Sequence, residues 1–379
     1  MALCAFLAAC GANDTSTNRG NQVAVIPPMS AGNGGGFSGA AGGQQAGAGA
    51  GGMAGMSSSA GATGSGSAGT AGGSAGAAGG AAGSLAGMGG RGGGGAGMTG
   101  GAGAGAGGSG PIPTGEICTR WKAARTNLTE GMWNGNVASC EPGDMTPEAR
   151  ATAHALHSLY RTMAGLEPVE MTEEGNRLAQ GCALLMAANS RISHTPDSSW
   201  TCYTEEAADT AGSSSLSSGG AVSSVDGYMI DPGNPTTIGH RRWILANMLA
   251  SVGYGSAGRY SCQYQPAQRA PAGAKAWVAW PPPGQVPIQS FGSRFATIDE
   301  TGWTVQSDTI DLQGAQVTVS SGGMNLAVSV TQLSSGYGSR YALRFNPMGW
   351  TSAAGQTYTV TVSGVSMPIE YDVEVVDCP

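Results

Sequence analysis

The feature that most constrains this chain is a long stretch with almost no charged or bulky apolar residues. Between Asn21 and Gly115 the only charged side chain is Arg91, and Gly, Ala and Ser dominate. Such a segment has little apolar surface to bury, so it cannot offset the entropy that ordering costs. We therefore expect residues 11–115 to form a disordered tether with an r.m.s. span of about 55 Å. Folded domains are expected in the remainder of the chain.

The amino terminus predicts export and lipid attachment. Leu7-Ala8-Ala9-Cys10 looks like a bacterial lipobox, in which the cysteine thiol carries a diacylglycerol as a thioether. Residues 1–10 are therefore interpreted as a lipoprotein signal segment, with Cys10 as the lipidation site. The segment lacks Lys and Arg and its apolar region is short, so the true start is expected upstream of Met1. Gly11 rather than Asp follows the cysteine, which resembles lipoproteins anchored to an outer membrane or cell surface. The alternative is a chance cysteine in an apolar terminus.

The remaining cysteines also favour an exported protein. They are even in number, widely spaced and free of CxxC pairs, which fits disulfides better than a metal site. Six cysteines allow 15 pairings, and buried free thiols are the alternative. The expected pairs are Cys118–Cys140, Cys182–Cys202 and Cys262–Cys378.

Charge and motif content exclude several classes of function. The net charge is −7, and no basic patch with interleaved aromatic residues occurs, so nucleic-acid binding is not expected. No apolar run reaches the length of about 18 residues that a transmembrane helix needs. The folded region contains no His-Glu-x-x-His, Walker-type or Gly-x-Ser-x-Gly motif. Catalysis is therefore not indicated by any recognisable enzyme motif.

Residues 116–283 combine helical periodicity with short strand-like runs. Apolar residues recur at helical spacing up to Met163, and Gly165 ends that helix. Thr172 can cap the next helix, with Glu173 and Glu174 in its first turn. Helices followed by strands predict a mixed α/β layer structure. The expected elements are helices at 149–163, 172–191 and 238–249 and strands at 251–254 and 276–280.

Residues 284–379 read as a second domain. Their apolar residues alternate with period two, and Gly and Ser clusters separate the runs, which is typical of a small antiparallel β-sandwich. The prolines at 281–283 predict a rigid hinge between the two domains. The expected strands are 315–320, 326–333, 341–345, 358–365 and 371–376.

Five short motifs between residues 157 and 255 form an ordered set. Gly239-His240-Arg241-Arg242-Trp243-Ile244-Leu245 is the longest, and Ser193-His194 follows the second helix. The others are His157–Arg161 with Gly165–Pro168, Val225–Met229 and Val252–Gly255. In order and spacing they resemble the CAP superfamily, the cysteine-rich secretory and antigen 5 group. The resemblance implies a secreted, disulfide-stabilised α-β-α sandwich over residues 116–283.

The resemblance also implies a cleft lined by two histidines and two acidic residues, which holds a divalent metal in some members. His194 and His240 match the histidines, whereas Ser214 stands where the family has a glutamate. The acidic candidates are Glu205, Glu206 and Asp226, and the candidate cleft set is His194, Ser214, His240 and Glu206. A stable zinc site usually needs a third protein ligand. A metal such as Zn²⁺ at His194 and His240 is one hypothesis, and a hydrogen-bonded pair that shapes a cleft is the other.

Several other side chains are expected to be structural. His154 and His157 share one helix face, and a solvated or core-edge position is expected for both. Aromatic core packing is expected for Trp277, Trp280 and Trp303. Arg241 and Arg242 are expected to be surface charges.

Two functions remain open. The first is a lipid-anchored, extracytoplasmic CAP-like binding or structural module of the cell envelope. Its partners are the membrane, through the lipid, and a cell-wall component, an apolar ligand or a protein. The second is a metal-dependent hydrolase acting on peptide or cell-wall substrate through a cleft between His194 and His240.

Overall fold

The computed structural model describes residues 114–268 and 274–379. The predicted signal segment 1–10 with Cys10, and the predicted tether up to residue 113, lie outside the described residues. All the described residues belong to one compact unit. Within this part of the chain, no helix has both the length and the apolar character needed to cross a bilayer.

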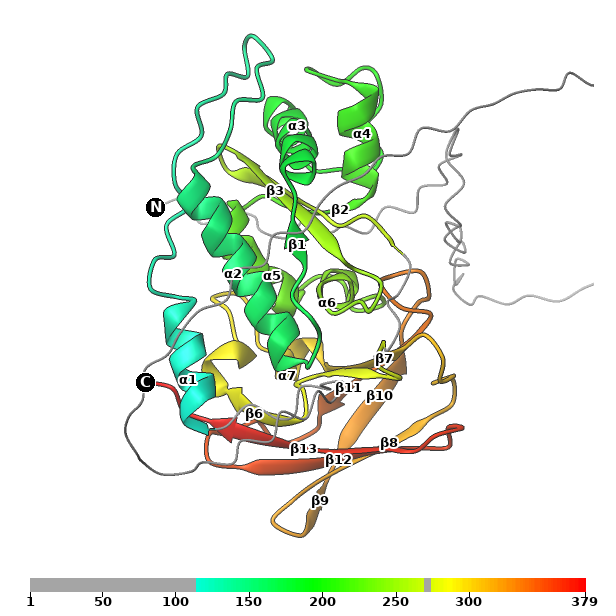
Figure 1. Cartoon of the computed structure of the whole chain (residues 1–379). Helices are drawn as coiled ribbons and strands as arrows, with labels where there is room; N and C mark the ends of the chain where they lie inside the picture. The colour runs from blue at the N-terminus through cyan, green and yellow to red at the C-terminus, as the bar shows by residue number, and fades with distance from the viewer. Residues whose placement is uncertain (1–113, 269–273) are drawn as a thin grey trace, which may run out of the picture. The chain divides into compact units, whose positions relative to one another are not determined.

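The helices lie mainly in the first half of the described chain (Figure 1). The first one begins two residues before the predicted domain start at 116. The helices are α1 (Thr114–Ala123), α2 (Pro147–Met163), α3 (Glu173–Asn189), α4 (Glu205–Gly212), α5 (Ala221–Ile230), α6 (Gly239–Ile244), the 3-10 helix η1 (Ile288–Phe291) and α7 (Ile298–Thr301).

Two of the three predicted helices match the structure closely. Helix α2 follows the predicted periodicity, and the Thr172 hydroxyl caps α3 by accepting from the amide of Gly175 at 3.1 Å. The third prediction, 238–249, is too long because α6 ends at Ile244. The guanidinium of Arg161 binds the carbonyl oxygens of Ile244, Ala246 and Leu249, so this segment turns to meet a side chain instead of continuing the helix.

The strands form three sheets, with orders β1-β3-β4-β2, β10-β11-β7-β5 and β6-β13-β12-β8-β9. The strands are β1 (Glu170–Met171), β2 (Ser214–Ser217), β3 (Ser251–Ala257), β4 (Tyr260–Tyr264), β5 (Val278–Trp280), β6 (Gly284–Pro287), β7 (Trp303–Ser307), β8 (Gln316–Ser321), β9 (Met324–Leu326), β10 (Val328–Gln332), β11 (Tyr341–Pro347), β12 (Thr357–Ser363) and β13 (Ile369–Val376).

The first sheet is the middle layer of an α-β-α sandwich, which confirms the predicted fold class. Helices α3 and α4 cover one face, and α2, α5 and α6 lie on the other side (Figure 1). Glycines allow α3 to approach the sheet closely. A Cβ atom at Gly253 would lie 2.0 Å from the carbonyl of Gly175, and one at Gly255 would lie 2.2 Å from the carbonyl carbon of Ala179. No larger residue fits at either position without a shift of the helix.

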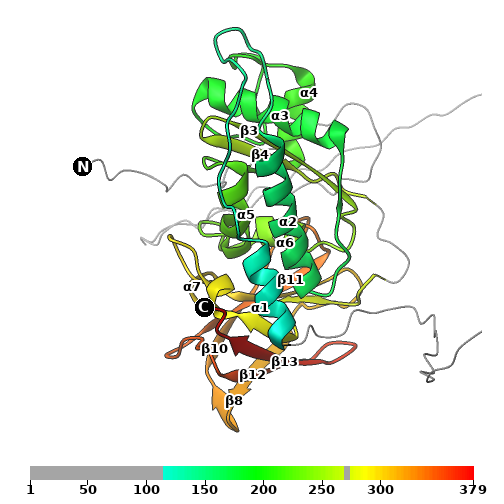
Figure 2. The same ribbon diagram turned by 60° about the vertical axis from the view of Figure 1, so that its left-hand side comes forward.

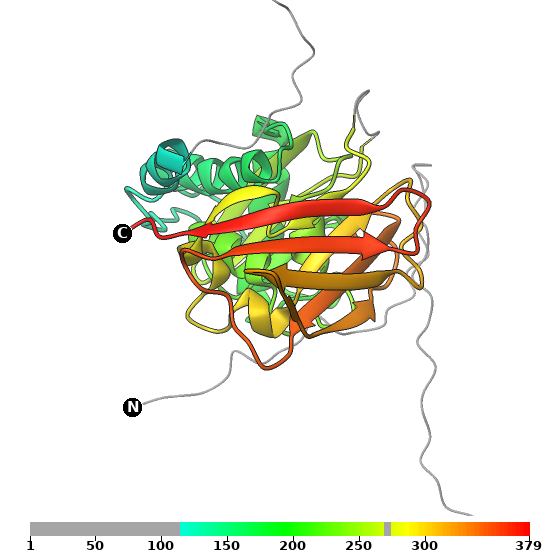
Figure 3. The same ribbon diagram turned by 90° about the horizontal axis from the view of Figure 1, so that it is seen from below.

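The other two sheets form the predicted β-sandwich. Along β13, Tyr371, Val373 and Val375 are buried, whereas the acidic residues between them are exposed, as expected of a strand with one face on a core. Strands β13, β12 and β8 run side by side (Figure 3). Most pairings are antiparallel, but β6 pairs parallel with β13.

The predicted hinge at 281–283 is wrong, because those prolines lie inside the sandwich. Strand β5 precedes them and pairs with β7 in one sheet, and β6 follows them and pairs with β13 in the other. Val278–Trp280 therefore belongs to the sandwich, although it precedes the predicted boundary at 283. A single hydrophobic core also runs from α1 and α2 through α5 into both sandwich sheets.

The six cysteines form disulfides, but the predicted pairing is wrong. The observed bonds are Cys118–Cys378, Cys140–Cys202 and Cys182–Cys262. The first joins α1 to the end of the chain after β13 (Figure 2). The others tie the loops around α3 and join α3 to β4. Partners lie 260, 62 and 80 residues apart, so no local rule of spacing predicts them.

Candidate functional site

His194 lies in the loop between α3 and α4 and is exposed. Its Nδ1 lies 2.9 Å from the carbonyl oxygen of Ala211, near the end of α4. A carbonyl oxygen only accepts, so Nδ1 carries the proton in this bond. In the neutral ring Nε2 is then left with the lone pair, which makes it the nitrogen able to bind a metal or a proton.

His240 is the second residue of α6, and its orientation is set by a buried carboxylate. Its Nδ1 donates to Oδ1 of Asp231 at 2.8 Å, and its backbone amide donates to Oδ2 at 3.0 Å. The side chain of Asp231 is fully buried. The amide nitrogen of Asn234 also donates to Asp231 Oδ1, at 2.7 Å. The hydrogen bond to Asp231 therefore fixes His240 in the Nδ1–H form, which His194 also has. Nε2 is then the basic nitrogen of His240.

Asp231 was missed from the sequence, although a signal was present. It follows α5 directly and adopts the left-handed conformation (φ 55°) at the helix end. The run Asp231-Pro-Gly-Asn-Pro235 is rich in turn formers and leads to the Gly239-His240 motif. The available indication of a partner for His240 was an acidic residue at the end of a helix, one short loop before that histidine.

Ser214 lies on β2 and is buried, but its hydroxyl donates to the carbonyl oxygen of Thr210 at 2.7 Å. Its neighbour Ser215 connects β2 to the His240 side of the sheet. The carbonyl oxygen of Ser215 accepts from the Tyr228 hydroxyl at 3.0 Å, and the Tyr228 ring lies 4.7 Å from the His240 ring between centroids. Tyr228 thus joins β2 to His240.

Two of the three acidic candidates, Glu206 and Asp226, are engaged elsewhere. Glu206 lies on the exposed surface of α4, where both its oxygens accept from the Arg177 guanidinium at 2.7 Å, and Glu174 shares the same arginine. These hydrogen bonds from Arg177 lower the pKa of Glu206, so its carboxylate stays ionised and paired. Asp226 accepts from Arg125 and from the Tyr160 hydroxyl, each at 2.6 Å.

The positions of these side chains show whether they could bind a metal ion together. Within residues 114–268 and 274–379, no three His, Cys, Asp or Glu side chains are grouped so that they could hold an ion. Nε2 is the basic nitrogen of His194 and of His240, but Glu206 is held by Arg177 and Ser214 by a backbone carbonyl. The described residues therefore do not supply the third ligand that a stable zinc site needs, and we derive no chemical step through a metal.

The prediction that Arg241 and Arg242 are surface charges is wrong. Both are fully buried, and their guanidinium groups bind mainly backbone carbonyl oxygens. Burial lowers the pKa of each to about 10, which leaves both charged at neutral pH. Sequence alone could not show this, because two adjacent arginines after a helix start are normally solvated.

His154 and His157 are structural, as expected, but only His154 lies near the edge of the core. His154 is half-buried, with Nε2 2.8 Å from the Val169 carbonyl oxygen. His157 is fully buried, and its Nδ1 lies 2.8 Å from the Tyr254 hydroxyl. Burial, with Arg161 nearby, holds the pKa of His157 well below 6.5. Trp280 and Trp303 are fully buried in the core, which confirms the prediction for those two residues.

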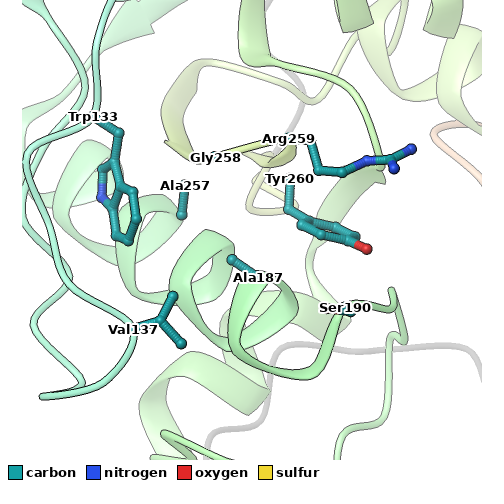
Figure 4. Close-up of a pocket in the computed structure, with 8 residues that line it drawn as sticks. All are labelled: Trp133, Val137, Ala187, Ser190, Ala257, Gly258, Arg259 and Tyr260. Carbon is teal, nitrogen blue, oxygen red and sulfur yellow. The ribbon is translucent and has the colours of Figure 1, made fainter.

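One hollow is lined by none of the predicted cleft residues. It has a volume of about 490 Å³, and Trp133 and Tyr260 flank it, with Ala187 and Ala257 between them (Figure 4). The Trp133 ring is fixed because its Nε1 donates to the Pro142 carbonyl oxygen at 2.7 Å. This volume falls within the range of small-molecule binding sites.

A family profile and a solved structure are similar to part of this chain. Residues 154–278 match the profile of the CAP, or cysteine-rich secretory protein, family. No match was found among curated proteins. Among solved structures, the chain is similar to an extracellular protein containing a SCP domain from Bacillus anthracis str. Ames, with 14% identity and a TM-score of 0.26. The similarity covers 34% of this chain and 45%, less than half, of that one. The helix and strand order, the motifs around His194 and His240 and the profile match identify residues 154–278 as a domain of the CAP superfamily.

Proposed function

We propose that this chain is an exported, lipid-anchored module of the cell envelope, whose CAP domain binds a ligand rather than cleaving it. Three disulfides among the described residues support export, because such bonds form in oxidising compartments. Lipid attachment through Cys10 rests on the lipobox-like sequence. It predicts that Cys10→Ser moves the full-length protein from the membrane fraction to the soluble fraction, and retention in the membrane fraction would contradict the anchor.

The observation that carries the binding role is the engagement of Glu206. Its bidentate pairing with Arg177 leaves it on the helix surface, and Ser214 gives its hydroxyl to a backbone carbonyl. Glu206 and Ser214 are thus engaged with Arg177 and Thr210, and the carboxylate that pairs with His240 is that of Asp231. The hollow beside Trp133 and Tyr260 instead offers rigid aromatic surface, on which an apolar ligand or a cell-wall component can pack.

The test is binding of the full-length protein to isolated cell envelopes after treatment with a chelator. The proposal expects binding to persist without metal and Trp133→Ala to weaken it. Trp350→Ala is the matched control, because Trp350 is also half-buried and its Nε1 also donates to a carbonyl oxygen at 2.7 Å, that of Ala327. Stoichiometric Zn²⁺ whose removal abolishes binding would overturn the proposal.

One observation favours the hydrolase instead. The buried Asp231 holds His240 with Nε2 as the basic nitrogen, which is how a general base is oriented in many active sites. For this alternative, His240→Ala and Asp231→Asn must both abolish hydrolysis of peptide or cell-wall substrate, with the fold retained. A divalent metal at His194 and His240 would need a ligand in addition to the described ones.

A further inference from the structure

The loop from Asp231 to Ile238 joins α5 to α6, and the paired residues Asp231 and His240 lie at its two ends. Two of its residues, Asp231 and Ile238, have positive φ values of 55° and 44°. Such conformations are unfavourable for residues with a side chain and persist only where surrounding contacts hold them. The contacts that hold this loop come largely from the β-sandwich.

Arg241 makes the first set of contacts. Its Nε donates to the Met229 carbonyl oxygen at 2.5 Å and its Nη2 to that of Ile230 at 3.0 Å, directly before Asp231. The same guanidinium reaches into the sandwich, where Nη1 donates to the Gly302 carbonyl oxygen at 2.6 Å and Nη2 to the Thr301 hydroxyl at 3.0 Å. The end of α5 and the start of β7 are thereby tied to one buried charge.

Arg242 and the loop between β10 and β11 make the second set. Arg242 donates to the carbonyl oxygen of Thr237 at 3.1 Å, and to those of Ser334 and Ser339 at 2.6 and 3.0 Å. The amide of Ser334 donates back to the Thr236 carbonyl oxygen at 2.9 Å. Ile238 also packs in a small apolar cluster with two sandwich residues, Leu333 and Ala342.

Tyr337 provides a third set of contacts, at the residue directly before His240. Its ring packs against Gly239, where a Cβ atom would lie 2.8 Å from Tyr337 Cδ1. Gly338 (φ 67°) brings the same loop against Arg242, since a Cβ there would lie 2.4 Å from the Arg242 carbonyl oxygen. The peptide bond that leads into His240 is therefore enclosed by a sandwich loop.

From these contacts we propose that Tyr337 and the β10–β11 loop are positioning elements for His240. The β-sandwich then holds a segment of the CAP domain in place rather than acting as a separate module. His194 serves as an internal control, because the carbonyl oxygen to which it is hydrogen-bonded is that of Ala211, which belongs to the α-β-α layers. The inference goes beyond the proposed function, which places binding in the hollow beside Trp133 and Tyr260, because the positioning is measured on the His240 ring itself.

The test measures the tautomers of His194 and His240 in the full-length protein by imidazole ¹H–¹⁵N NMR, with every variant at the same alkaline pH. In the unaltered protein, His240 is expected as the Nδ1–H form. Tyr337→Ala is expected to change its tautomer ratio by about tenfold, since loss of a packed contact is worth about 1–2 kcal/mol. The His194 signal should stay unchanged, and Tyr337→Phe, which keeps the ring, should preserve the His240 signal.

Tyr341→Ala is the matched control, because Tyr341 is a partly buried tyrosine at the other end of the same loop. Ser339→Ala, which removes one hydroxyl contact to Arg242, is a milder variant in case Tyr337→Ala does not fold. An unchanged His240 signal in folded variants, or an equal change with Tyr341→Ala, overturns the inference. A change specific to His240 supports the positioning, and intact envelope binding in the same variant is then the expected result, because the proposed binding hollow lies beside Trp133 and Tyr260.

Discussion

The two faces of the first sheet are stabilised in different ways. On the α3 side, a small separate core is reinforced by Cys182–Cys262 and by the nearby Cys140–Cys202 bond. On the α2 and α5 side, the core continues into the β-sandwich, and buried arginines bridge the layers. A face that lacks a large continuous core is held by covalent links, and a face that has one is held by packing and by charge-assisted hydrogen bonds.

The largest effect is expected on the arginine side. Arg241→Met removes four hydrogen bonds and leaves buried carbonyl oxygens, including those of Met229 and Gly302, without donors. We expect a loss of about 4 kcal/mol in the free energy of unfolding, measured with urea. Arg340→Met, at an exposed arginine, is the control and should change it by less than about 0.5 kcal/mol. Equal effects would show that the buried arginine does not bridge the layers.

On the opposite face, the disulfides should account for most of the added stability. Replacing Cys140 and Cys202 together by serine opens a link between residues 62 apart and is expected to cost about 3–4 kcal/mol. Hydrogen exchange should locate the loss in α3, α4 and their loops, with α2 and α5 still protected. Uniform loss of protection over both faces would contradict the contrast drawn between them.

Close packing of α3 on the sheet gives a smaller effect. Gly255→Ala places a methyl group 2.2 Å from the Ala179 carbonyl carbon, so the helix must move outward. We expect a cost of about 2 kcal/mol. Gly227→Ala is the matched control, because that position in α5 has open space around its Cβ and should gain up to about 1 kcal/mol in helix propensity. A neutral Gly255→Ala would mean that this face is loosely packed.

The sequence predicted those features of the structure that depend on neighbouring residues better than those that depend on residues far apart in the chain. Periodicity and capping are local, so α2, the cap at Thr172 and the strands of the sandwich were predicted near their observed bounds. The motif around His240 also identified the CAP domain correctly. Strand β7 was missed, although it is central in its sheet and buried throughout, because it has no clear alternation of exposed residues.

The other errors named here concern contacts that the fold creates. The cysteine partners, the buried Arg241 and Arg242, and the sheet membership of Val278–Trp280 depend on which surfaces meet, and sequence spacing does not encode this. The candidate site divides in the same way. The two histidines followed from motifs, whereas the engagement of Glu206 by Arg177 and the pairing of His240 with Asp231 required the fold.

The smallest expected effect is a difference between the two faces in how the free energy of unfolding depends on pH. His157, on the α2 side, is buried, with Arg161 and His154 on its own helix and Tyr254 opposite, and its pKa lies well below 6.5. The unfolded chain binds a proton near pH 6.5 whereas the folded one does not, so stability falls below that pH by up to about 1.4 kcal/mol per unit. We expect His157→Gln, compared in urea at pH 7 and pH 5.5, to lose this part of the slope, and exposed His194→Gln to keep it. If both variants retain the slope, carboxylates rather than the buried imidazole govern the acid response, and the two faces do not differ in this respect.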